Sequence, residues 1–97
     1  MSLSDKLRAE VGTASWRLLA PHHQRGGLVC VDGALDLVEV GVAVAQDDAG
    51  KVRSWMDAGQ IVRVTDDQAG AWAAQGQAFA FLIVQPFVLV TPIEAEA

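Results

Sequence analysis

The chain has 97 residues, of which 52% are hydrophobic and 20% are charged, and its net charge is −5. This length supports one domain with one modest core, and this composition excludes intrinsic disorder. The last basic residue is Arg63, so the C-terminal third of an acidic chain has no cation to attract nucleic acid or an anionic membrane. We therefore expect a single domain over residues 1–97, frayed at 1–2 and 92–97, with neither nucleic acid nor a membrane as its partner.

Cysteine content and apolar run length indicate where the protein resides. Cys30 is the only cysteine, so the chain forms no internal disulfide and has no zinc quartet, which is typical of a reduced, cytoplasmic protein. The N-terminal sequence MSLSDKLRAEV has no continuous apolar segment before its charges, so it is not a signal peptide. The longest apolar stretch, residues 78–93, contains Gln85 and Pro86 and is too short for a membrane-spanning helix. These features predict a cytoplasmic location.

The first predicted element is an amphipathic helix over residues 3–20. Its apolar residues recur every three or four positions and share one helical face: Leu3, Leu7, Val11, Ala14 and Leu18. We expect Ser2 or Ser4 to cap its start and Pro21 to end it. Gly12 weakens the middle of such a helix unless a close packing contact requires it. Trp16 lies off the stripe, which predicts contact with a second surface.

Residues 28–46 contain a short strand and an ambiguous segment. Leu28 to Val31 is rich in β-formers and ends at the turn pair Asp32-Gly33, which predicts a strand. The alternating valines of residues 35–46 are compatible with a second strand in a hairpin. Wrapped as a helix, however, the same segment gathers its polar residues on about a third of the circumference. This clustering favours a mostly buried helix.

Two helices and a strand are predicted next. Residues 49–58 have apolar side chains at helical spacing and end at Gly59, a residue typical of helix C-termini. Residues 61–64 predict a short strand. Thr65 is expected to cap a further helix that ends at Gly76.

The C-terminal segment predicts the central strand of the sheet. Residues 78–84 are apolar on both faces, so we expect this strand to be covered from both sides. Pro86 cannot donate to a strand ladder, which predicts a bulge or a sheet edge before residues 87–90 continue. The order α-β-α-α-β-α-β predicts an α+β fold with about four helices on a sheet of three or more strands.

Several segments together resemble a known family. They are LDLVEVGVAVAQDD at residues 35–48, LIVQPFVLV at residues 82–90, the spaced Val52 and Trp55, and Trp16 with the PHHQR stretch. In their order they resemble a family of small bacterial proteins, domain of unknown function 2288, over nearly the whole chain. The resemblance implies a bacterial origin and a single soluble domain, and it implies no activity and no catalytic residues. Phe87 stands where the family often has Tyr or Trp, so a phenolic hydroxyl is dispensable there.

Candidate polar side chains gather around the expected buried helix. Asp36 and Glu39 would share one face of it, and the preceding loop offers Arg25 or His22 as a partner. The planar arginine fork can hold a carboxylate through two hydrogen bonds. Gln85 either satisfies backbone groups at a bulge or points into a pocket. We predict a polar cluster of Arg25, Asp36, Glu39 and Gln85 with a structural role, and ligand binding or catalysis are its alternatives.

Other reactive residue types have simpler interpretations. His22-His23 are adjacent and cannot form the i, i+4 pair that binds a metal from one helix, so we expect them in a loop, near the end of the preceding helix. Asp47-Asp48 and Asp66-Asp67 precede helices, where carboxylates cap free N–H groups. Gly26-Gly27 lacks the Lys-Ser/Thr of a phosphate-binding loop, and Cys30 has no base nearby in the sequence. We predict no catalytic residue, no metal site and no cofactor.

Two functional classes deserve comparison. Residues 35–64 resemble the helix-turn-helix and wing of DNA-binding regulators, but Lys51 and Arg53 on the second helix are opposed by Asp48 and Asp57. Three tryptophans and 52% hydrophobic residues in so short a chain instead favour a homodimer or small homo-oligomer. We expect its contact surfaces at Trp16 and around Phe87.

The functional prediction is therefore a self-associating or partner-binding module without catalytic activity. A helix-turn-helix regulator is one alternative. A small-ligand-binding protein or enzyme that uses Asp36 and Glu39 is the other, and its small-molecule ligand is unknown.

Overall fold

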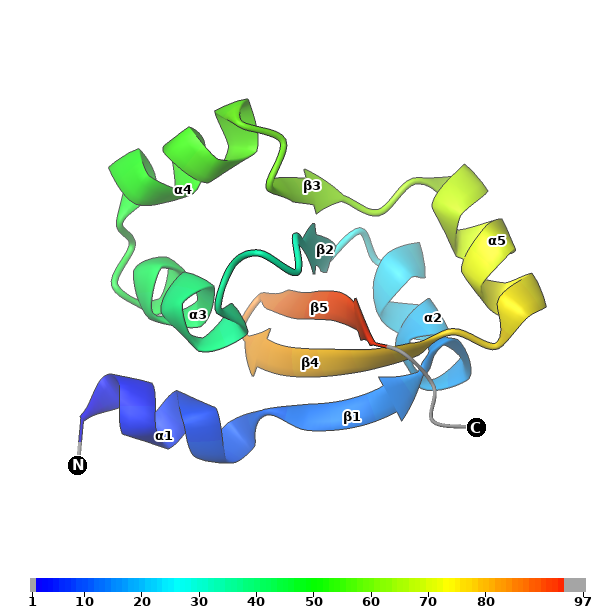
Figure 1. Cartoon of the computed structure of the whole chain (residues 1–97), viewed down its shortest axis with the longest axis horizontal. Coiled ribbons are helices and arrows are strands. Elements are labelled where there is room, and N and C mark those ends of the chain that lie inside the picture. Colours follow the sequence, from blue (N-terminus) through cyan, green and yellow to red (C-terminus); the bar gives the residue numbers. More distant parts are fainter. Residues whose placement is uncertain (1, 94–97) are drawn as a thin grey trace.

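The computed structural model describes residues 2–93, in which five helices and five strands follow one another (Figure 1). The helices α1 to α5 are Leu3–Glu10, Trp16–Gln24, Leu37–Ala45, Ala49–Asp57 and Asp66–Gln75. The strands β1 to β5 are Gly12–Ser15, Leu28–Val31, Ile61–Arg63, Ala78–Val84 and Phe87–Ile93. The predicted α+β domain is confirmed, and the order α-β-α-β-α-α-β-α-β-β has more elements than the sequence predicted.

The strands form one mixed sheet in the order β1-β4-β5-β2-β3. β2 and β5 run parallel, and the other neighbouring pairs are antiparallel. β4 and β5 form a hairpin in which Val84 pairs with Phe87, so Gln85 and Pro86 alone make the turn. The prediction of a bulge or sheet edge at Pro86 is wrong, because the chain reverses here and the turn places the proline outside the ladder.

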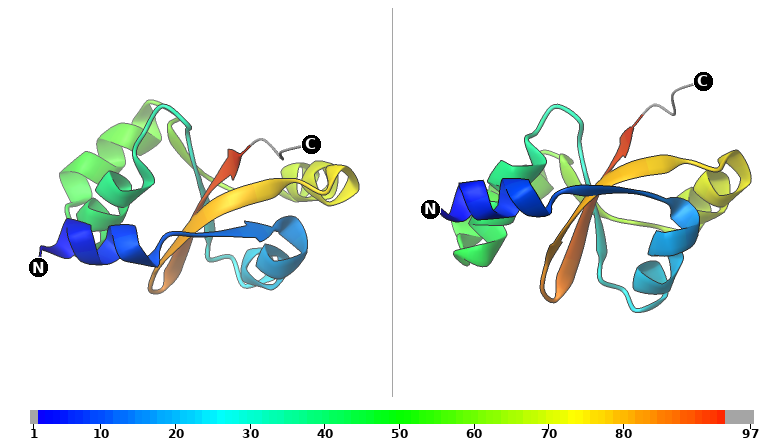
Figure 2. Two further views of the ribbon diagram at one scale, coloured as in Figure 1. Left: turned by 60° about the horizontal axis from the view of Figure 1, so that its bottom comes forward. Right: turned by 90° about the horizontal axis from the view of Figure 1, so that it is seen from below.

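Helices cover both faces of the sheet (Figure 2). We call the face covered by α1, α3 and α4 the α3 face, and the face covered by α2 and α5 the α2 face. The buried residues of the α3 face are Leu7, Val31, Leu37, Val38, Val40, Ile61, Leu82, Val84 and Leu89. Those of the α2 face are Trp16, Leu19, Leu28, Val64, Phe79, Val88 and Val90.

The inner strands supply side chains to both faces because successive strand residues point in opposite directions. On β4, Leu82 belongs to the α3 face and Phe79 to the α2 face, and both are fully buried. β4 lies between β1 and β5, so it is an inner strand covered on both faces as predicted, but β5 and not β4 is the central strand of the five. Ile83 is the exception on this strand, since 48% of its surface is exposed.

The predicted helix over residues 3–20 is wrong, because β1 divides it into α1 and α2. β1 pairs with the edge of β4, and a Cβ on Gly12 would lie 2.9 Å from the Phe81 ring, so a glycine is needed for the close approach. The chain also changes face here, since Leu7 is buried on the α3 face and Trp16 on the α2 face. Leu18, placed on the buried stripe by helical spacing, is 67% exposed.

The expected end of the helix at Pro21 is also corrected. β1 delays the start of α2 to Trp16, so Pro21 lies within this helix, which continues to Gln24. Pro92 and Ile93, expected to fray, instead pair with Phe79 and Ala78 at the end of β5. Ser2 caps α1 by accepting a hydrogen bond from the Asp5 N–H at 3.2 Å. The remaining residues expected to fray lie outside the described residues.

Local signals locate the other elements as predicted. The helical interpretation of residues 35–46 is confirmed by α3, which Asp36 caps by accepting a hydrogen bond from the Val38 N–H at 2.9 Å. Asp48 caps α4 in the same way through the Lys51 N–H, at 3.2 Å. Gly59, the second residue after α4, adopts a φ of +74°, a conformation that glycine tolerates best.

Candidate functional site

The predicted polar cluster does not assemble around Arg25. Arg25 follows the last residue of α2, on the α2 face, whereas Asp36 and Glu39 belong to α3 on the opposite face. The cation beside Asp36 is Arg8 of α1, whose Nη2 lies 3.5 Å from Asp36 Oδ2. Gln85 is exposed in the β4–β5 turn. Arg25 is close to Asp36 in the sequence but not in space, because β2 carries the chain from the α2 face to the α3 face between them.

Asp36 and Glu39 do line a common polar hollow of about 230 Å³ with Arg8, Asp48 and Lys51. The Arg8–Asp36 pair is exposed on both sides, so water screens it and it contributes little to stability. Glu39 is exposed, and within residues 2–93 its side chain forms no hydrogen bond or ion pair. These side chains therefore form a solvated charged surface between α1, α3 and the start of α4.

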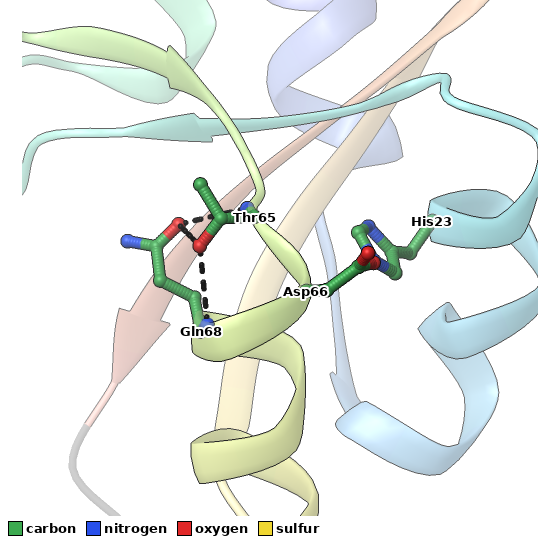
Figure 3. A network of polar contacts seen from close by, with 4 residues as sticks. All are labelled: His23, Thr65, Asp66 and Gln68. Atoms are coloured by element: carbon green, nitrogen blue, oxygen red, sulfur yellow. Dashed lines mark hydrogen bonds and ion pairs between the residues drawn. The ribbon is translucent and has the colours of Figure 1, made fainter.

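A second polar contact joins the end of α2 to the start of α5 (Figure 3). His23 Nε2 lies 2.9 Å from Asp66 Oδ1. α2 extends to Gln24, so His23 is within this helix and not in the loop that the sequence predicted. The His23 ring also packs on Trp16, with 5.8 Å between the ring centroids.

Aromatic side chains complete the seam between α2 and α5. Trp16 is 6% exposed, and its ring lies 5.6 Å from that of Trp72 and 6.0 Å from that of Phe79. The expected contact of Trp16 with a second surface is thus made inside the domain. Trp16 consequently offers no surface for a partner.

Cys30 lies on β2 and is half-buried on the α2 face. Burial raises the pKa of its thiol, and the nearby Asp32 carboxylate raises it further. The thiol is therefore mostly protonated at neutral pH and is a poor nucleophile. Within residues 2–93, no three His, Cys, Asp or Glu side chains gather in a group that could hold a metal ion.

An apolar hollow lies beneath α4. A hollow of about 140 Å³ opens there between α3, α4 and the sheet. The residues that line it are Val29, Val40, Val44, Val52, Met56, Ile61, Val62, Arg63, Phe87 and Leu89. We call this cavity the α4 hollow. It leads into a wider opening that shares Val44, Val52, Met56 and Phe87 with it.

The hollow exists because α4 packs loosely on the sheet. None of its side chains is fully buried, and Met56 is 55% exposed. Val52 and Met56 are four residues apart and so face the hollow together. Helical spacing in the sequence indicated an apolar face on this helix, but it did not indicate that the face would be incompletely filled.

The outer edge of β3 is a second unpartnered feature. β3 ends the sheet and pairs only with β2 among the described strands. The Asp32 N–H donates to the Gln60 carbonyl, and the Val64 N–H donates to the Leu28 carbonyl. These two bonds show which residues of β3 hydrogen-bond to β2, because bonded and non-bonded residues alternate along an antiparallel strand. The backbone groups of Val62 therefore point toward β2, and those of Ile61 and Arg63 point outward.

A solved structure has a similar fold. The structure is similar to the NMR solution structure of PA1075 from Pseudomonas aeruginosa, with a TM-score of 0.84 and 37% sequence identity. The match covers 98% of this chain and 88% of that one. No curated protein matches the sequence significantly.

Two further observations complete the comparison. Among the helices described, none is both long and apolar enough to cross a membrane. Residues 2–92 match the family model for a protein of unknown function, DUF2288. This match spans nearly the whole chain and agrees with the order of segments that suggested the same family. The chain therefore belongs to the DUF2288 family.

Proposed function

We propose that this protein is a cytoplasmic, non-catalytic module that forms a homodimer through the outer edge of β3. The observation that carries the proposal is the outward direction of the Ile61 and Arg63 backbone groups on an edge strand. An edge strand with unpaired N–H and C=O groups is a template for a further strand. Val62 and Met56 beside this edge are 39% and 55% exposed, which supports contact with another chain.

A second copy of the same strand fits this edge through a two-fold axis at Val62. Antiparallel pairing about that axis sets Ile61 opposite Arg63 of the other copy, and each such pair exchanges two hydrogen bonds. The same pairing places the two Val62 side chains next to each other. The register is thus self-complementary, as a two-fold interface requires.

Proline substitution tests this pairing selectively. The Arg63 N–H points outward, so Arg63→Pro removes a donor of the proposed interface and leaves the β2–β3 hydrogen bonds in place. We expect light scattering to give twice the 10.3 kDa chain mass for the unmodified protein and the monomer mass for Arg63→Pro.

Two controls separate edge pairing from other effects. Arg63→Ala removes the charge but keeps the N–H, so it should remain dimeric. Thr13 lies on the opposite sheet edge, β1, and Thr13→Pro should also remain dimeric. A monomer at all micromolar concentrations, or a dimer lost equally in all three variants, contradicts the proposal.

Duplex DNA is not part of this proposal. α3, α4 and β3 follow the order of a helix-turn-helix with a wing, yet five residues of α3 are buried. On α4, the cations Lys51 and Arg53 are exposed together with the acidic Asp57 and the capping Asp48. Phosphate attraction supplies most of the non-specific affinity for DNA, so this mixed charge supports a protein partner instead.

A further inference from the structure

The size and lining of the α4 hollow define the kind of molecule that fits it. Nine of its ten lining residues are apolar, and its volume is about 140 Å³. The hollow is open on one side, and its volume is close to the roughly 150 Å³ of an engineered apolar cavity that takes up benzene. The apolar body of an occupant is therefore about the size of one benzene ring or of a short branched alkyl chain.

Arg63 supplies the single charge in the lining of the α4 hollow. It alternates with Val62 on β3 and so shares the α3 face with Ile61. Within residues 2–93, the ion pairs are Arg8–Asp36 and His23–Asp66, and neither engages Arg63. Its guanidinium therefore has unpaired donors at the rim of an apolar cavity, and a planar carboxylate matches their geometry.

The helix above the hollow can adjust to an occupant. α4 has no fully buried side chain, so a small shift of this helix disturbs little of the core. Met56 is unbranched and polarizable, which lets it repack around apolar groups of different shape. Entry of a small molecule thus requires no rearrangement of the sheet.

We propose that the α4 hollow binds a small monocarboxylic acid, with its apolar body among the valines and Met56 and its carboxylate on Arg63. This inference is independent of β3 pairing, because the side chain of Arg63 and its outward N–H are used separately. It assigns Arg63 a role as a specificity-determining residue for an anionic headgroup.

Three probes of similar size and different charge test the proposal on the full chain. Benzoate, benzyl alcohol and benzylamine are titrated into ¹⁵N-labelled protein, and amide chemical shifts are followed. We expect benzoate to shift the amides of α4 and β3 in a saturable manner. Benzyl alcohol should bind about fivefold to tenfold more weakly, because it lacks the charge-assisted hydrogen bonds, and benzylamine should bind more weakly still.

Matched variants identify the cation. Arg63→Met removes the charge and keeps the apolar stem and the backbone N–H, so benzoate should lose its advantage over benzyl alcohol while self-association is unchanged. Arg25→Met makes the same change on the α2 face and should leave the order of the probes unaltered. The amide spectrum of each variant establishes that it is folded before titration.

The following results would overturn the inference. One is that no probe changes the amide chemical shifts of α4 and β3. Another is that benzoate changes only the amide chemical shifts of residues around the polar hollow near Arg8 and Lys51. A third is that Arg63→Met keeps the preference for benzoate. If dilution from dimer to monomer alone moves the amides of Val40, Val44 and Val52, which line the α4 hollow away from β3, a second copy of the chain fills it and the inference is wrong.

Discussion

Two glycines inside helices, Gly41 in α3 and Gly70 in α5, have opposite surroundings. A Cβ on Gly41 would lie 2.5 Å from Leu82 Cδ2 and 3.4 Å from Leu7 Cδ1, whereas a Cβ on Gly70 would meet nothing within 4 Å. Leu82 is fully buried, so it has little room to move away. At the first position glycine lets the helix approach the sheet closely, and at the second it only weakens the helix.

We expect Gly41→Ala and Gly70→Ala to change stability in opposite directions. Gly70→Ala should stabilise the protein by about 0.5–1 kcal/mol, the usual helix-propensity gain. At Gly41 the overpacking of the core should exceed that gain and leave a net loss of about 1–2 kcal/mol. Urea denaturation of the two variants measures both values. A stabilised Gly41→Ala variant would show that Leu82 can rotate away at little cost.

At the scale of single elements, local hydrogen bonds define the N-terminus of α5. None of its side chains is fully buried, and Trp72 is its main aromatic contact with the α2 face. A capping box begins the helix: the Gln68 N–H donates to Thr65 Oγ1 at 3.2 Å, and the Thr65 N–H donates to Gln68 Oε1 at 3.1 Å (Figure 3). Such reciprocal bonds satisfy two of the N–H groups that a helix start leaves open.

Thr65→Ala should therefore destabilise the protein by about 1 kcal/mol, because one capping acceptor is lost. Amide hydrogen exchange should accelerate more in α5 than in β4 and β5, since a helix without buried side chains opens locally. Thr65→Ser keeps the hydroxyl and is expected to retain most of the protection. Equal acceleration in α5 and the central strands would mean that α5 opens only with the whole domain.

At the scale of the molecule, the two clusters of buried residues share the same strands. Neighbouring residues of β5 belong to opposite faces, with Leu89 on the α3 face and Val88 and Val90 on the α2 face. Loss of β5 would therefore expose both clusters at once. This shared framework predicts that the two faces unfold in one cooperative step.

The tryptophans allow each face to be observed separately. Trp55 packs against the α3 face, and Trp16 and Trp72 belong to the α2 face. In Trp55→Phe the fluorescence reports the α2 face, and in the Trp16→Phe, Trp72→Phe double variant it reports the α3 face. Within each variant, the fluorescence and circular dichroism midpoints in urea should coincide. Separate midpoints would show that one face unfolds before the other.

The sequence by itself determined the elements whose ends are marked by short-range chemistry. Asp36, Asp48 and Thr65 bond to N–H groups two or three residues away, so the starts of α3, α4 and α5 are visible locally. The two-sided apolar pattern of residues 78–84 identified an inner strand for a similar reason. The family was also recognisable from the order of its segments, and the match over residues 2–92 confirms it.

Tertiary structure decided everything that depends on distant residues. Residues 3–20 have helical spacing, but the hydrogen-bonding edge of β4 makes four of them a strand, because a paired ladder outweighs a weak local preference. Asp36 contacts Arg8 and not Arg25, since the side of the sheet on which a residue lies depends on how the chain crosses it. The α4 hollow likewise arises from how α4 packs on the sheet, and the outward backbone groups of β3 arise from how β3 pairs with β2. Local spacing in the sequence encodes neither.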